Sequence, residues 1–144
     1  MKSLSLVLSV SLLLAGCTAS RSFITSEQVI GPYSPAVKVG NLLFVSGQIA
    51  MKPGTTELAA DDIEIQTHQV LDNVKEMLSK AGYGMEDVVQ CTVYLKDIKD
   101  FNKMNQVYSG YFVQGSYPTR TTVEVSNLPR NARIEITVLA SDTH

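Results

Sequence analysis

An arginine at the point where a loop meets a strand is well suited to bind an anion. Arg120 lies in the segment YPTRTTVEV, residues 117–125, just after Pro118 and just before a β-branched run. Proline favours an extended approach, so residues 117–119 are predicted to form a loop that enters a strand at 121–125. A guanidinium held at such a corner can bind a carboxylate through two parallel hydrogen bonds. The alternative is a solvated arginine at the end of a strand.

The cysteine and histidine residues offer few other reactive arrangements. Cys91 alternates with Val93 and Leu95 in an apolar run, which predicts a buried core thiol in preference to a nucleophile. His68 and His144 are far apart in the sequence. A zinc site or a Ser-His-Asp triad needs more partners than these residues supply. The sequence therefore predicts no metal site, and it carries no flavin or nucleotide signature.

The first residues of the chain resemble a bacterial lipoprotein signal. Lys2 precedes an apolar stretch over residues 4–14, and a Leu-Ala-Gly-Cys string ends at Cys17. This pattern predicts a signal peptide over residues 1–16 and acylation of Cys17 as the first mature residue. The apolar stretch is shorter than the roughly 20 residues of a transmembrane helix, so acyl chains would provide the membrane anchor. The alternative is an ordinary secretory signal cut after Ala19.

The predicted signal places the mature protein in the bacterial cell envelope, as a lipoprotein on the periplasmic side. Thr18 stands where an aspartate would suggest retention in the inner membrane, so the outer membrane is favoured if the organism is Gram-negative. We expect residues 17–28 to form a polar tether, and residues 23–144 to form the folded domain. Without residues 1–16 the chain has 144 − 16 = 128 residues, enough for one domain with its own core.

The charge balance argues against nucleic-acid binding. Loss of Lys2 with the signal leaves 12 − 1 = 11 basic residues against 14 acidic ones, a formal net charge of −3. The sequence also lacks a basic tract. A nucleic-acid surface needs clustered lysines and arginines that release counterions. We therefore expect no nucleic-acid partner.

Hydrophobic periodicity predicts an α+β domain with the order β-β-α-β-α-β-β. Strands at 36–39 and 42–46 flank a tight turn at Gly40-Asn41. The loop over 53–62 ends in aspartates that can cap a helix, and Gly82 supplies a stop. Between them, apolar residues recur at helical spacing, at Val70, Val74, Met77, Leu78 and Ala81.

The second half of the domain is predicted to contain a strand around Cys91, a second helix and two further strands. Asp100 is a candidate N-cap for this helix. The final strands span 121–125 and 133–140, and residues 23–25 could add an edge strand. We expect both helices to pack on one face of a mixed sheet. The apolar stripe of the second helix is predicted to face that sheet and consists of Phe101, Met104, Tyr108, Tyr111 and Phe112.

Several strings in this domain resemble the Rid family of reactive-intermediate deaminases, also called the YjgF family. They occur in the family's order across residues 23–144. The resemblance implies a chorismate-mutase-like (YjgF-like) fold and a homotrimer whose sheets form a central barrel, with three clefts between subunits. The strings are IGPYSPAV at 30–37, SGQI at 46–49, LDNVKEML at 71–78, VYLKDIKDF at 93–101, MNQVYSGYF at 104–112, YPTRTTVEV at 117–125 and LPRNARIEI at 128–136.

The same resemblance implies an activity and roles for three residues. The activity is hydrolysis of 2-imino acids or their enamine tautomers, such as 2-iminobutanoate and 2-iminopropanoate, to 2-oxo acids and ammonia. Arg120 matches the arginine that binds the substrate carboxylate. Glu135 matches the glutamate that orients and deprotonates the attacking water, although a strand carboxylate facing solvent is the alternative. Thr122 occupies a position that is often cysteine, where the backbone carbonyl holds a water or the imine nitrogen.

Four further residues match substrate-binding positions of the family's cleft. Tyr33 and Asn105 match residues that position the ligand. Ser46 and Gly47 match a strand end that lines the pocket, where glycine lets the backbone approach closely. For Ser46 the alternative is a hydrogen bond to nearby backbone.

The implied partners are a small imino or 2-oxo acid, two further copies of the chain, and a membrane through the lipid anchor. No cofactor is expected, because a protonated imine is already electrophilic and needs mainly positioning and proton transfer. A competing hypothesis is an envelope-tethered module that binds a small carboxylate or a partner protein without turnover. The net negative charge disfavours a nuclease or chaperone.

Overall fold

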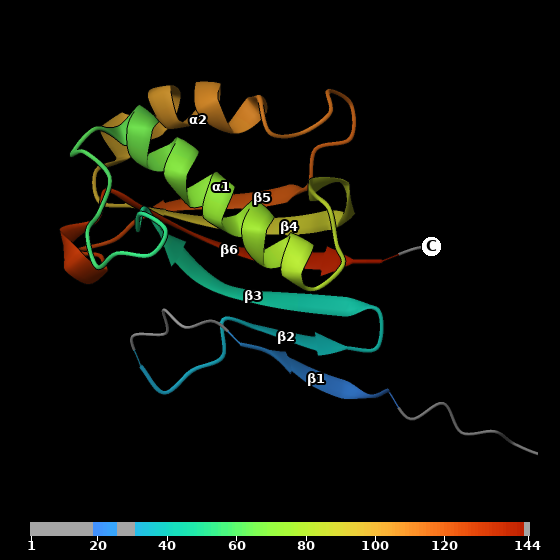
Figure 1. The fold of residues 1–144 in the computed structure, drawn as a ribbon. Helices are drawn as coiled ribbons and strands as arrows, with labels where there is room; N and C mark the ends of the chain where they lie inside the picture. The colour runs from blue at the N-terminus through green and yellow to red at the C-terminus, as the bar shows by residue number, and fades with distance from the viewer. Residues whose placement is uncertain (1–18, 26–30, 143–144) are drawn as a thin grey trace, which may run out of the picture.

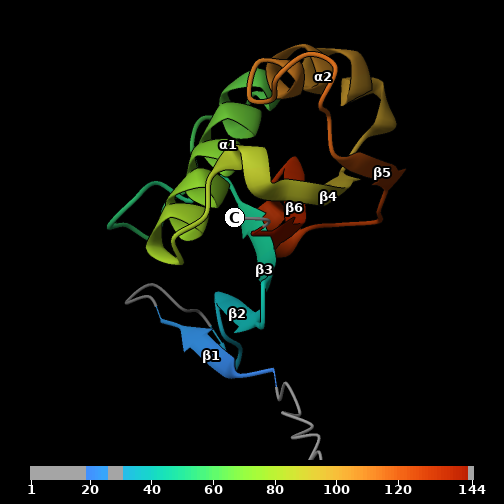
Figure 2. The ribbon, with the colours of Figure 1, turned by 90° about the vertical axis from the view of Figure 1, so that its right-hand side faces the viewer.

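A six-stranded mixed sheet with both helices on one face forms the body of the computed structural model, which describes residues 19–25 and 31–142 (Figure 1, Figure 2). The strand order is β1-β2-β3-β6-β4-β5. Of the pairs in this described sheet, β4 and β5 are parallel and the others are antiparallel. The elements are β1 (Arg21–Ile24), β2 (Ala36–Val39), β3 (Leu42–Ile49), α1 (Ile63–Lys80), β4 (Val88–Leu95), α2 (Phe101–Ser109), β5 (Thr119–Glu124) and β6 (Ile134–Ser141).

The predicted α+β class is therefore confirmed, with β1 as the additional edge strand. The first helix forms as predicted. The Asp62 carboxylate accepts a hydrogen bond from the Ile65 N–H at 3.0 Å and caps α1. Gly82 follows the helix with a φ of 81°, a conformation that glycine adopts without a side-chain clash. The buried stripe of α1 faces the core and includes Val70, Leu71, Val74 and Leu78.

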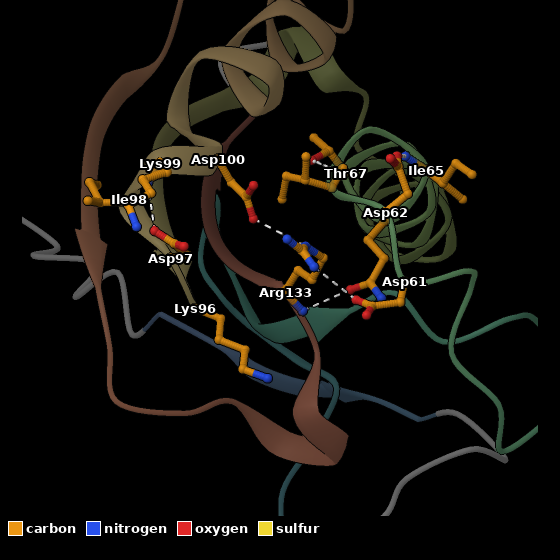
Figure 3. A network of polar contacts seen from close by, with 12 residues as sticks. Asp61, Asp62, Ile65, Thr67, Lys96, Asp97, Ile98, Lys99, Asp100 and Arg133 are labelled. Carbon is orange, nitrogen blue, oxygen red and sulfur yellow. Dashed lines mark hydrogen bonds and ion pairs between the residues drawn. The ribbon is translucent and has the colours of Figure 1, made fainter.

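The start of α2 differs from the prediction. Asp100 occupies the N-cap position, but its side chain makes no capping hydrogen bond. A single 3-10 turn precedes the helix, and Asp97 caps that turn by accepting from the Lys99 N–H at 2.9 Å. Asp100 instead accepts from Nε of Arg133 at 3.2 Å, and the same guanidinium pairs with Asp61 (Figure 3). Asp100 thus links α2 to the start of β6.

The predicted stripe of the second helix is confirmed in part. Met104 and Tyr108 are buried and Phe101 packs at the margin of the core. Tyr111 and Phe112 also pack at that margin, but they lie beyond the helix, which ends at Ser109. The core thiol predicted at Cys91 is also confirmed, because this side chain is fully buried.

Two strands are longer than predicted. β5 begins at Thr119, because this residue already pairs with Gln90 of β4. Arg120 is therefore the second residue of a strand and not part of the loop before it. β3 continues past Ser46 to Ile49, because a bulge lets it keep pairing with β6.

The predicted signal over residues 1–16 and the lipidation site at Cys17 lie outside the described residues. The described part of the predicted tether over 17–28 is residues 19–25, and it contains β1, which pairs with β2. Lipid attachment and the envelope location therefore stay predictions. No helix in the described part of the chain is both long and apolar enough to cross a lipid bilayer.

Candidate active site

A cavity of about 480 Å³ opens where the pairing of β2 with β3 ends. Its lining comes from β3, the start of β6, one side of α1 and the segment before β2. Four of the predicted site residues line it, namely Tyr33, Ser46, Gly47 and Glu135. We call these residues the glutamate group. They come from three separate parts of the chain, which the sheet brings together.

Ser46 and Gly47 form a β-bulge in β3. The pairing of β3 with β6 shifts between Val45 and Gln48, so two residues of β3 oppose one of β6. The Ser46 hydroxyl donates a hydrogen bond to the Ser34 carbonyl at 2.7 Å. The side chain of Ser46 is therefore engaged with nearby backbone, and it lines the cavity in that position.

Gly47 makes room for the side chain of Glu135. A Cβ atom at Gly47 would lie 1.8 Å from Oε1 of Glu135, which is far inside van der Waals contact. Glu135 is half-buried at the cavity wall. This burial raises the pKa of Glu135 above its ordinary value of 4.5. A carboxylate with a raised pKa is better matched to proton transfer near neutral pH.

The other predicted site residues meet at the edge strand β5, beneath α2. Nη2 of Arg120 donates to Oδ1 of Asn105 at 2.7 Å. The guanidinium carbon of Arg120 lies 4.5 Å from the centre of the Tyr108 ring. The Thr122 hydroxyl is buried and has no hydrogen-bond partner within the described ranges. We call Arg120, Asn105 and Thr122 the arginine group.

Arg120 and Arg133 differ in how their charges are compensated. Arg133 lies between the carboxylates of Asp61 and Asp100, and both pairs measure 3.2 Å (Figure 3). In the part of the chain that the structure describes, no carboxylate pairs with Arg120. Arg133 is thus a structural cation, whereas Arg120 keeps its full charge available to an external anion.

The two groups lie on opposite faces of the sheet. Arg120 pairs with the buried Cys91, so it shares the helix-covered face. Glu135 pairs with Tyr94, which is three residues along β4 from Cys91 and therefore points to the other face. Ideal strand spacing puts the Cα atoms of Arg120 and Glu135 about 14 Å apart. A small ligand cannot touch both side chains within one protomer.

Two residues that line the cavity region were not anticipated from the sequence. Asn73 of α1 donates to the carbonyls of Ile49 and Met51 at 3.0 and 2.9 Å and fixes the end of β3. Its polar side chain beside the apolar stripe of α1 was the available signal. Arg130 adopts a φ of 55° and donates to the Thr56 carbonyl at 2.9 Å. Nothing in its string predicted this backbone conformation.

Comparisons with known proteins agree with this architecture. The family model described as "Endoribonuclease L-PSP" matches residues 24–142. A RutC family protein of Saccharolobus solfataricus is 57% identical over 111 residues, covering 77% of this chain and 87% of that protein. The 2-iminobutanoate/2-iminopropanoate deaminase of Escherichia coli is 42% identical over 113 residues, covering 77% of this chain and 88% of that enzyme.

A solved structure is similar over nearly all of the described domain. The crystal structure of a putative endoribonuclease from Thermotoga maritima has a TM-score of 0.80 at 43% identity, covering 85% of this chain and 98% of that one. The chain therefore belongs to the Rid (YjgF/L-PSP) family, as its sequence strings predicted.

We predict that Gly47→Ala displaces the Glu135 carboxylate without unfolding the protein. Only the far end of a flexible side chain has to move, because the new Cβ would meet Oε1. Once moved toward solvent, Glu135 should titrate closer to its ordinary pKa of 4.5, as followed by NMR of its carboxyl carbon. Gly110→Ala is the control, since its Cβ would lie 3.4 Å from the Val107 carbonyl. An unchanged Glu135 titration in Gly47→Ala would contradict this prediction.

The raised pKa of Glu135 also predicts a pH-dependent effect on stability. The folded state holds the Glu135 proton more tightly than the unfolded state does. The free energy of unfolding therefore falls as pH rises through the folded-state pKa. Glu135→Gln should therefore raise the free energy of unfolding at neutral pH and lose this advantage well below pH 4.5. Urea unfolding at both pH values measures it. Glu57→Gln removes one negative charge from an exposed side chain and is the matched control.

Proposed function

We propose that this protein hydrolyses 2-imino acids, or their enamine tautomers, to 2-oxo acids and ammonia. The observation that carries the proposal is the Arg120 guanidinium, which is fixed by Asn105 and left without an acidic partner in the described chain. Such a group suits a ligand that brings its own carboxylate. The family membership and the printed name of the Escherichia coli relative support the same chemistry.

Glu135 is the proposed acid and base of this reaction. A water oxygen adds to the carbon of the protonated imine while Glu135 accepts one water proton, which gives a neutral carbinolamine. Glu135 then gives that proton to nitrogen, and the C–N bond breaks with its electron pair leaving on ammonia. The hydroxyl proton passes to the ammonia, so the products are the 2-oxo acid and ammonium. Help of this kind contributes about 10² to 10⁴ fold, which is roughly 3 to 5.5 kcal/mol of barrier.

The remaining residues would hold the substrate and the water in place. Arg120 fixes the carboxylate end, and this orientation makes the attack of water nearly intramolecular. The backbone carbonyl of Thr122 would hold the water or the imine nitrogen. Tyr33, with the bulge at Ser46, would close the opposite wall.

We infer that the protein is a homotrimer and that each complete site combines groups from two protomers. The separation of Arg120 and Glu135 on opposite faces supports this inference, because one chain alone cannot bring them together. The face not covered by the helices also carries exposed apolar side chains. Phe23 and Phe44, both paired with Val37, are 59% and 48% exposed. An apolar surface of this kind favours burial against further copies.

We predict that Arg120→Ala loses most 2-iminobutanoate hydrolysis while the trimer survives. The reason is loss of the carboxylate contact, with no buried ion pair left behind. An amino-acid oxidase can generate the imine in the presence of semicarbazide, and the wild-type protein should suppress semicarbazone formation. Lys75→Ala, at an exposed side chain of α1, is the control and should behave as wild type.

Two results would count against this proposal. Wild-type turnover in Arg120→Ala would show that the reaction does not need Arg120. A semicarbazone rate that the wild-type protein leaves unchanged would show a binding module without turnover.

A further inference from the structure

We propose that Tyr108 is a positioning residue for Arg120. The ring of Tyr108 supports the guanidinium without neutralising it, so the carboxylate of the ligand meets the full positive charge of Arg120. This inference rests on the proposed function and adds a residue that no resemblance assigned. It concerns the arginine group and the face of α2 above it.

Three neutral groups surround the Arg120 guanidinium. Its central carbon lies 4.5 Å from the centre of the Tyr108 ring and 5.7 Å from that of Phe101. Both distances are within the range of a cation–π contact. Oδ1 of Asn105 accepts a hydrogen bond from Nη2 at 2.7 Å. These contacts fix the plane of the guanidinium, and among the described residues only Asn105 accepts a hydrogen bond from its five N–H donors.

The sequence of α2 builds this support as one unit. Phe101, Asn105 and Tyr108 are spaced four and three residues apart, so they lie on the same side of the helix. Tyr108 is 3% exposed, and its ring packs against Phe112 with centres 4.8 Å apart. Tyr108 is therefore held firmly enough to orient the side chain that rests on it.

The hydroxyl of Tyr108 does not explain why a tyrosine fits here. It is buried, and the polar group beside it is the Cys91 thiol, which is only a weak hydrogen-bonding partner. Burial raises the pKa of Tyr108, so the phenol stays neutral and cannot form an ion pair with Arg120. What the site uses is the face of the ring, which attracts a cation through its quadrupole.

The test measures binding of the product analogue 2-oxobutanoate by calorimetry, with methyl 2-oxobutanoate as the uncharged control ligand. Tyr108→Phe keeps the ring and should bind 2-oxobutanoate as the wild-type protein does. Tyr108→Leu removes the ring and should weaken binding by about threefold to thirtyfold, the effect of one cation–π contact. Binding of the methyl ester should change little, and for 2-iminobutanoate KM should rise with kcat nearly unchanged.

A second variant tests the neutrality of the support without opening a cavity. Asn105→Asp places a carboxylate against the Arg120 guanidinium, where it would compete with the carboxylate of the ligand. We expect affinity for 2-oxobutanoate to fall by about tenfold or more, since a close charge pair is worth at least that. This variant tests the neutrality of the support, and Tyr108→Met, which fills similar space without a ring, replaces Tyr108→Leu as the test of the ring if Tyr108→Leu fails to fold.

The outcomes separate this inference from the proposed function. If Arg120→Ala abolishes binding of 2-oxobutanoate but folded Tyr108→Leu binds like wild type, Tyr108 does not position the guanidinium and the proposed function stands. A loss of affinity in Tyr108→Phe, or wild-type affinity in Asn105→Asp, also overturns the inference. Wild-type binding in Arg120→Ala would show that Arg120 does not bind the ligand carboxylate, and this result would contradict the proposed function as well.

Discussion

The uncompensated charge of Arg120 is the interaction on which the rest of this account depends. A half-buried guanidinium normally lies near a carboxylate, as Arg133 does between Asp61 and Asp100. Arg120 instead rests on the ring of Tyr108 and bonds to the neutral amide of Asn105. This arrangement holds the side chain still and leaves its charge for an anion that the chain does not supply.

The pleat of the sheet determines how that charge can be used. Arg120 lies on the face beneath α2, whereas Glu135 lies on the opposite face, beside the bulge that contains Gly47. Alternation along a strand is strict, so no side-chain rotation within one chain brings the two groups onto one small ligand. In the proposed trimer, a second protomer would bring the two groups together, and the exposed apolar side chains of Phe23 and Phe44 on the uncovered face support such an association.

Local signals in the sequence were sufficient to predict the helices and strands, but not the tertiary contacts between them. The Asp62 cap and the Gly82 stop predict α1, because both act within one turn of the helix. Asp100 looked like a cap, but its carboxylate binds Arg133, a partner distant in sequence. The residues of the site were identified from matching strings. Their division between two faces depends on strand register, which local patterns do not contain.

The central claim is that a complete site takes Arg120 from one protomer and Glu135 from another. Co-expression of Arg120→Ala with Glu135→Gln tests this most directly, with 2-iminobutanoate hydrolysis as the readout. In randomly mixed trimers, about a quarter of the sites would contain both intact residues, so about a quarter of wild-type activity should return. Mixed trimers no more active than the two variants measured separately would contradict the account.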